Sequence, residues 1–246
     1  MRLEFQGHDY KYAAEQMMLT LFPEERPQYA PLVEGENGVR LTLEEADGVL
    51  LAQAELIWAG QHTQGEAHTP AISREDALVW DRTCQRILKL AFYRAGVTAL
   101  GKEPPWGALT GVRPVKIPTR AMERWATPQE AQRELEEVYR VSPNRAELAM
   151  DCAQASLAAK RSLREDEVSL YIGIPFCPTR CAYCSFVSAD VGRTMKLLSP
   201  FLEVLLQEVD ITAAELKRAG YVVRTLYVGG GTPTTLSAPQ LETLLG

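Results

Sequence analysis

The sequence predicts an α/β protein in two parts, an α+β domain followed by a βαβ unit. Residues 38–58 alternate between apolar and polar side chains around an Asp-Gly pair, which is typical of a β-hairpin. Residues 73–95 and 143–159 carry apolar residues at helical spacing. Residues 168–176 and 222–228 are short apolar runs on either side of a long helical segment, as expected of neighbouring parallel strands.

The composition limits the number of domains and the kinds of partner that this protein can have. The chain has 246 residues, 46% of them hydrophobic, which is enough for one large domain or two ordinary ones. The formal charge of -6 argues mildly against a nucleic-acid partner. No apolar run is long enough to cross a bilayer, and the polar N-terminal residues lack the apolar core of a signal peptide. We therefore expect a cytoplasmic protein that neither inserts into a membrane nor binds nucleic acid.

The first part begins with the hairpin, whose turn we place at Asp47-Gly48. A helix should follow, with Ser73 as its N-cap and Gly96 just past its end. Its predicted apolar face carries Trp80, Cys84, Leu88 and Ala91.

Residues 101–120 are rich in Gly and Pro and predict irregular surface loops. The next helix should open at Ser142-Pro143. Its predicted apolar face carries Leu148, Cys152, Ala155 and Ala159.

The charged stretch 160–167 predicts a domain boundary. We divide the chain into an N-terminal α+β domain of unknown role, residues 1–165, and a second domain, residues 166–246. In the second domain, Ser199 and Pro200 should open a long helix that ends at Gly220. The strand after it leads into a Gly-Gly-Gly-Thr-Pro segment, and a capping box of Ser237 and Gln240 should then begin another helix.

Three of the five cysteines lie within eight positions, directly after the first strand of the second domain: Cys177, Cys181 and Cys184. The odd count and the clustering do not fit a disulfide framework. We expect Cys84 and Cys152 to be ordinary core residues on helix faces. For the clustered thiols, structural zinc and simple packing compete with an iron–sulfur cluster. Zinc would need a fourth ligand that the local sequence does not offer.

A four-iron cluster normally takes four cysteines. With three, one iron lacks a protein ligand and is open to a small molecule, as the metal is in a catalytic zinc site. This interpretation explains why the loop carries three thiols.

The motifs "YIGIPFCPTRCAYCSF" and "LYVGGGTPTTLS" resemble those of the radical S-adenosylmethionine (SAM) enzymes, and among them the oxygen-independent coproporphyrinogen III dehydrogenases. The segment "WGALTGVRPVKI" and the long N-terminal extension resemble the HemZ-like branch of that family. Gly173 stands where other members usually have His.

The resemblance implies that the three cysteines bind a [4Fe–4S] cluster and that SAM chelates the open iron. A radical derived from SAM would then drive decarboxylation of two propionates of coproporphyrinogen III, giving protoporphyrinogen IX in haem biosynthesis. It also implies an electron donor such as flavodoxin or ferredoxin. The resemblance assigns no catalytic side chain beyond the cofactor ligands.

Cofactor contacts are implied in the same way. Tyr171, Tyr183 and Gly230 would contact the cluster-bound SAM, and Gly231 and Thr232 would contact a possible second SAM. Two of these residues have simpler explanations, since Tyr171 could fill core space and Tyr183 could shield the cluster from water.

These enzymes build a partial (β/α)6 barrel, of which this sequence holds only the first two βα units. We therefore expect a truncated radical SAM core, an N-terminal fragment that is inactive alone. Two other functions remain open, a haem-binding chaperone of the same superfamily and a radical SAM methyltransferase. A basic group could meet substrate carboxylates, although a solvated surface is the simpler reading: Arg113, Lys116, Arg120 and Arg124.

Overall fold

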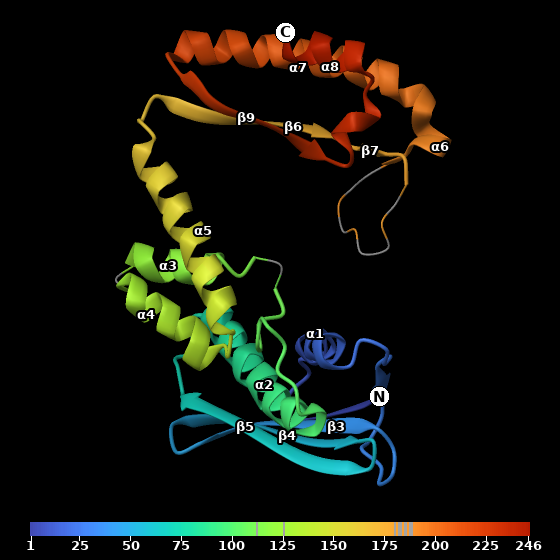
Figure 1. The fold of residues 1–246 in the computed structure, drawn as a ribbon, viewed down its shortest axis with the longest axis vertical. Helices are drawn as coiled ribbons and strands as arrows, with labels where there is room; N and C mark the ends of the chain where they lie inside the picture. Colours follow the sequence, from blue (N-terminus) through green and yellow to red (C-terminus); the bar gives the residue numbers. More distant parts are fainter. Residues whose placement is uncertain (112, 125, 180, 182–183, 185, 187–188) are drawn as a thin grey trace. The chain divides into compact units, whose positions relative to one another are not determined.

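The computed structural model describes residues 1–111, 113–124, 126–179, 181, 184, 186 and 189–246. The chain divides into two compact units, Met1–Lys160 and Arg161–Gly246, each described here by itself (Figure 1). Both units combine helices with a sheet, which fits the predicted α/β class. No helix among the described residues is long and apolar enough to cross a membrane.

The first unit is built on a five-stranded sheet with strand order β2-β1-β3-β4-β5. β1 pairs in parallel with both of its neighbours, whereas β3, β4 and β5 pair antiparallel. The strands are β1 (Arg2–Gln6), β2 (Gln28–Tyr29), β3 (Gly38–Ala46), β4 (Val49–Trp58) and β5 (Gln61–Pro70).

The predicted hairpin is confirmed as β3 and β4. Asp47 and Gly48 both have positive φ, 51° and 74°, as a two-residue hairpin turn with the right twist requires. A second turn of the same kind at Ala59 and Gly60 leads into β5, which the sequence analysis did not anticipate. Ala is a rare residue at positive φ, so this turn carries little sequence signal.

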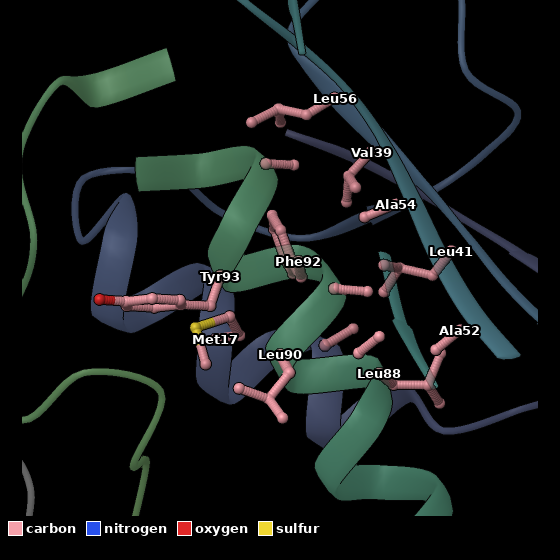
Figure 2. Close-up of a cluster of buried hydrophobic side chains, with 14 of the residues drawn as sticks. Met17, Val39, Leu41, Ala52, Ala54, Leu56, Leu88, Leu90, Phe92 and Tyr93 are labelled. Atoms are coloured by element: carbon pink, nitrogen blue, oxygen red, sulfur yellow. The ribbon is translucent and has the colours of Figure 1, made fainter. Parts of the chain in front are cut away.

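Two helices, α1 (Lys11–Leu21) and α2 (Ala77–Leu100), lie on the same side of this sheet (Figure 1). Their apolar faces meet the sheet in the main core, where Met17, Phe92 and Tyr93 are almost fully buried (Figure 2). α2 approaches β5 very closely at Gly65, because a β-carbon there would lie 2.2 Å from the Ala91 carbonyl oxygen. Glycine is thus required at this position.

Both predicted ends of α2 were wrong. Asp76 caps the helix by accepting hydrogen bonds from the backbone N–H groups of Leu78 and Val79, at 3.1 and 3.0 Å. Gly96 lies inside the helix, packed against Leu21, and the helix ends at Gly101 in the left-handed conformation. Helix packing on α1 therefore outweighs the helix-breaking tendency of Gly96.

The rest of the first unit is helical. A separate apolar cluster joins α3 (Lys116–Arg124), α4 (Pro128–Arg133), a π-helical turn (Glu134–Val138) and α5 (Pro143–Ser162). α5 begins where predicted, but its predicted apolar face was wrong. Leu148 and Cys152 are exposed, and a different stripe, in which three of five residues are alanine, is buried instead: Ala146, Ala149, Met150, Ala153 and Leu157. Alanine allows helices to pack closely. Because alanine is only weakly hydrophobic, the buried stripe gives a weak signal in the sequence.

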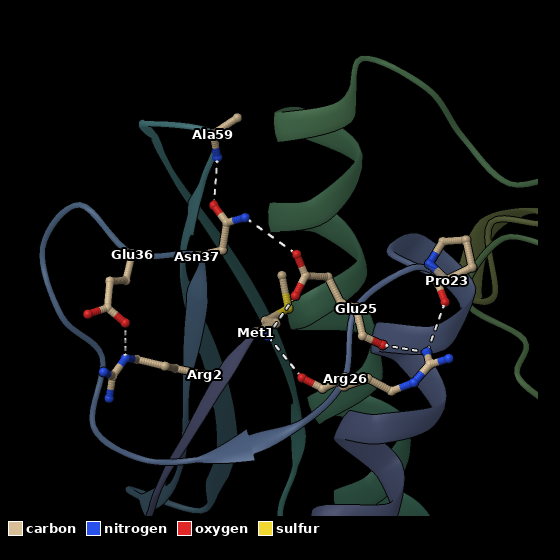
Figure 3. A network of polar contacts seen from close by, with 8 residues as sticks. All are labelled: Met1, Arg2, Pro23, Glu25, Arg26, Glu36, Asn37 and Ala59. Carbon is tan, nitrogen blue, oxygen red and sulfur yellow. Dashed lines mark hydrogen bonds and ion pairs between the residues drawn. The ribbon is translucent and has the colours of Figure 1, made fainter.

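Polar contacts hold the N-terminus against the sheet (Figure 3). The Met1 ammonium donates to Glu25 Oε2 at 2.7 Å and to the Arg26 carbonyl oxygen at 2.9 Å. Asn37 links Glu25 to the Ala59 backbone N–H. The ion pair with the ammonium lowers the pKa of the Glu25 carboxyl, so this contact favours the folded state at neutral pH.

The second unit is the predicted βαβ unit followed by a helix. The parallel pair β6 (Glu167–Ile174) and β9 (Val222–Gly230) is connected through α7 (Leu198–Ala219), which ends at Gly220 as predicted. The capping box of Ser237 and Gln240 begins α8 (Ala238–Leu245), as predicted. Short elements complete the unit: β7 (Phe176–Cys177), β8 (Ala189–Asp190), α6 (Val191–Thr194) and two 3-10 turns (Met195–Leu197, Pro233–Thr235).

The half-buried histidine His8 should make the stability of the first unit depend on pH. His8 Nδ1 accepts from the Tyr10 backbone N–H, and Nε2 lies 3.1 Å from the Leu41 carbonyl oxygen, so the neutral ring satisfies both contacts. Burial lowers the pKa of His8 below its ordinary value of 6.5. The unfolded chain then binds more protons near that pH, so the first unit should lose stability as the pH falls below 6.5.

Urea unfolding followed by tryptophan fluorescence measures this, because all four tryptophans lie in the first unit. Between about pH 7.5 and about pH 5.5, His8→Gln should show a smaller loss of stability than wild type. His68→Gln, a change at an exposed histidine, is the matched control and should follow wild type. Equal pH dependence in His8→Gln and wild type would contradict the assignment.

Candidate metal and cofactor site

The carboxyl ends of β6 and β9 lie side by side. The two strands run in parallel with Gly173 opposite Gly229 and Ile174 opposite Gly230. The cysteine segment, residues 175–186, follows β6 in the sequence. The glycine segment, residues 229–233, begins with the last two residues of β9 and continues beyond it. Ligand sites in parallel α/β sheets commonly occur at this edge, where loops follow the carboxyl ends of the strands.

Strand alternation divides these residues between two faces. Ile172 and Ile174 are buried in the cluster formed with α7 and α8. Tyr171 and Gly173 point to the opposite face, where Tyr171 is 60% exposed. The explanation of Tyr171 as a core aromatic is therefore wrong for this unit.

Tyr227, which the sequence analysis did not single out, is the partner of Tyr171. Their rings stack with centroids 5.6 Å apart, and Tyr227 is 66% exposed. The two rings border Gly229, since a β-carbon there would lie 2.6 Å from Tyr227 Cε1 and 3.1 Å from the Tyr171 hydroxyl. The signal was present in the sequence, because Tyr171 and Tyr227 each stand two residues before a glycine at the end of a strand.

The glycine segment touches the cysteine segment directly. Gly231 N–H donates to the Ile174 carbonyl oxygen, and Thr232 N–H donates to the Phe176 carbonyl oxygen, both at 2.8 Å. A β-carbon on Gly231 would lie 2.7 Å from the Phe176 oxygen and 2.8 Å from Cys177 Sγ. Two motifs more than fifty residues apart therefore form one surface.

Gly230 pairs with Ile174 and has a φ of 99°, a conformation that L side chains rarely adopt. Gly230, Gly231 and Thr232 are all half-buried. The predicted contact residues of the glycine segment thus share the sheet edge with Cys177.

The three thiols differ in environment. Cys177 is buried at 8% exposure, Cys181 is exposed and Cys184 is half-buried. Cys184 N–H donates to the Cys181 carbonyl oxygen at 3.0 Å, which holds these two residues close together. Among the described residues, no three His, Cys, Asp or Glu side chains gather at one centre. Convergence of the three sulfurs therefore stays a prediction.

The donor chemistry fits a cluster of soft metal ions. All three side chains are free thiols in one short loop, and thiolates are the usual ligands of iron–sulfur clusters. Tyr183 lies outside the described residues. The prediction for the two other cysteines is confirmed for Cys84, which is buried, and wrong for Cys152, which is exposed.

The chain is similar to curated proteins whose names refer to coproporphyrinogen III oxidation or to heme. The chain is 32% identical over 213 residues to the oxygen-independent coproporphyrinogen-III oxidase-like protein HemZ of Bacillus subtilis. It is 42% identical over 81 residues to the oxygen-independent coproporphyrinogen III oxidase of Pseudomonas aeruginosa, and 40% identical over 78 residues to the heme chaperone HemW of Escherichia coli.

Coverage differs between these relatives. The match to HemZ takes in 84% of this chain and 41% of the relative, whereas the other two matches take in 32% of this chain and 16% and 20% of the relatives. This chain therefore spans well under half the length of each of these relatives. No protein-family model matches the chain, and no solved structure does.

Contact between Gly231 and Cys177 gives a testable prediction. In Gly231→Ala the added methyl group must displace Cys177 or the Phe176 carbonyl, and overpacking of this kind costs about 1–3 kcal/mol. Iron and sulfide bound after anaerobic reconstitution should therefore fall severalfold.

Gly173→Ala is the matched control, because its β-carbon would meet only Tyr171 Cε1, at 3.3 Å. Circular dichroism would show that both variants keep their secondary structure. Full metal loading in Gly231→Ala would show that the contact does not position the thiol.

Proposed function

Because the chain is related to the oxygen-independent coproporphyrinogen III oxidases and their HemZ-like branch, we propose that the full-length protein is a radical SAM enzyme. Its proposed reaction is oxidative decarboxylation of coproporphyrinogen III propionates to give protoporphyrinogen IX. The observation that carries the proposal is the contact of the glycine segment with Cys177 at the carboxyl edge of β6 and β9.

In this proposal Cys177, Cys181 and Cys184 hold a [4Fe–4S] cluster as thiolates. Together with SAM, the bound cluster supplies the one-electron and hydrogen-abstraction chemistry that no side chain can perform. Residues of this chain position the cofactors. The absence of a side chain at Gly231 leaves room for Cys177, and Gly230 lies against the backbone of Ile174. Thr232 is held in place by its hydrogen bond to the Phe176 carbonyl oxygen.

The stacked rings of Tyr171 and Tyr227 form the remainder of this surface. Both are largely exposed and lie on the same face of the sheet as Gly173 and Gly229. We propose that they provide an apolar wall for the cofactor, Tyr171 by direct contact as the family resemblance implies. Flavodoxin or ferredoxin would be the electron donor, and the rest of the partial (β/α)6 barrel would complete the site in the full-length protein.

Haem binding is a second candidate function. The chain is 40% identical over 78 residues to a protein named as a heme chaperone, so this similarity does not separate the two functions. The match to HemZ extends through most of the first unit as well, at 84% of the chain, which favours the enzyme.

The test uses full-length protein reconstituted anaerobically with iron and sulfide. Incubation with coproporphyrinogen III, SAM and dithionite should give protoporphyrinogen IX and 5′-deoxyadenosine, measured by chromatography. Cys177→Ala should abolish both products, because it removes the thiol that contacts the glycine segment. Cys152→Ala replaces an exposed cysteine outside the loop and should behave as wild type.

Three other outcomes decide between the candidates. Formation of 5′-deoxyadenosine without decarboxylation would keep the radical assignment and remove the substrate assignment. Stoichiometric haem binding without either product would favour the chaperone. Equal activity of Cys177→Ala and wild type would contradict the proposed cluster site.

A further inference from the structure

Two neighbouring hollows in the first unit carry cations that the proposed function does not use. The first, about 260 Å³, lies between α2 and residues 108–111. The second, about 240 Å³, lies along α3. Ile117 and Tyr139 line both hollows, so the two adjoin. We call them together the basic hollow.

Its charge comes from two helices. α2 contributes Arg82, Arg86 and Lys89 to the first hollow. Their spacing of four and three residues places them on one face of the helix. α3 contributes a second row at a spacing of four: Lys116, Arg120 and Arg124. α2 and α3 therefore each contribute three cations to the lining of the basic hollow.

Little negative charge balances these rows. Glu134 is the one acidic side chain among the described residues that line the basic hollow. None of the six cations forms an ion pair within the part of the chain that the structure describes. Like charges at a spacing of four destabilise a helix, so charge repulsion within each row opposes helix stability. They are also unusual in a chain with a net charge of -6.

Lys89 is the most informative of the six. Its Nζ donates to Thr110 Oγ1 at 2.9 Å, and the side chain is half-buried. Burial lowers the pKa of its ammonium below the ordinary value, because a partly buried cation loses contact with water. A bound anion would relieve this cost.

Apolar groups form much of the remaining lining. Leu90, Ala108, Leu109 and Ile117 line the hollow beside the aromatic ring of Tyr139. A free inorganic anion gains nothing from such a lining, whereas a molecule with an apolar body and anionic side groups is complementary to both parts. Arginine suits carboxylates in particular, since its planar head can bind both oxygens at once.

We propose that the basic hollow is a binding site for an organic polycarboxylate with an apolar body. Its cations bind the carboxylates, and its apolar lining contacts the carbon skeleton. The site belongs to the first unit and stands independently of the cysteine loop. Only the choice of a tetrapyrrole as the source of the carboxylates rests on the proposed function. Nucleic acid is the less suitable ligand, because apolar side chains form much of the lining beside these cations.

The probe is coproporphyrin III, a stable tetracarboxylate, titrated into full-length protein and followed by porphyrin fluorescence. Its tetramethyl ester has the same ring system without the charges. Lys89→Gln and Arg120→Gln should each weaken binding of the acid about tenfold, the effect expected for losing one charged hydrogen bond, and leave binding of the ester unchanged. Lys102→Gln, at an exposed lysine outside the hollow, is the charge-matched control and should bind as wild type.

Repeating the titration in the Cys177→Ala, Cys181→Ala, Cys184→Ala background separates this site from the proposed enzyme site. If the Lys89→Gln change still weakens porphyrin binding in this triple variant, the result supports the basic hollow as the binding site. This conclusion holds whether or not the protein decarboxylates coproporphyrinogen III. Unchanged binding of the acid in both Lys89→Gln and Arg120→Gln overturns the proposal. Binding of inorganic phosphate or of a short single-stranded RNA with the same dependence on Lys89 overturns the assignment to carboxylates. Tryptophan fluorescence checks that Lys89→Gln is folded, and Arg120 is exposed, so its replacement should not disturb folding.

Discussion

The contact between Gly231 and Cys177 is the constraint on which the candidate site depends. Two backbone hydrogen bonds of 2.8 Å hold the glycine segment against the end of the first strand, and only the absence of a side chain at Gly231 leaves room for the Cys177 sulfur. The parallel register of β6 and β9 brings the two motifs to one edge. Every cofactor contact proposed for Gly230, Gly231 and Thr232 follows from that register, because a shift of one residue would turn Gly231 away from the thiol.

The first unit carries its own sheet and its own core. Close packing of α2 on β5 at Gly65 fixes the helix that presents Arg82, Arg86 and Lys89. Packing of α3 and the π-helical turn around Tyr139 fixes the second row of cations. The two units therefore offer different chemistry, a sulfur-rich edge in one and a cationic hollow in the other. This division accounts for a long first domain without recognisable catalytic motifs.

Much of the fold could be predicted from local signals. The hairpin at Asp47-Gly48, the βαβ unit and the capping box at Ser237 depend on nearby residues, and all three are confirmed. The errors have tertiary causes. Gly96 remains helical because it packs against Leu21, and α5 buries an alanine stripe that hydrophobicity alone underrates. The motifs located the sheet edge, but the pairing of Tyr171 with Tyr227 and the meeting of two cationic rows require the three-dimensional arrangement.

In the proposed site, three thiolates would leave one iron of a cluster open to SAM. The most direct measurement is electron paramagnetic resonance of the reduced, anaerobically purified full-length protein before and after addition of SAM. We expect the signal of a four-iron cluster in the reduced protein. The shape of this signal should change when SAM is added, because SAM would coordinate the open iron. A signal that SAM leaves unaltered, or protein that contains zinc in place of iron, would contradict the proposed site.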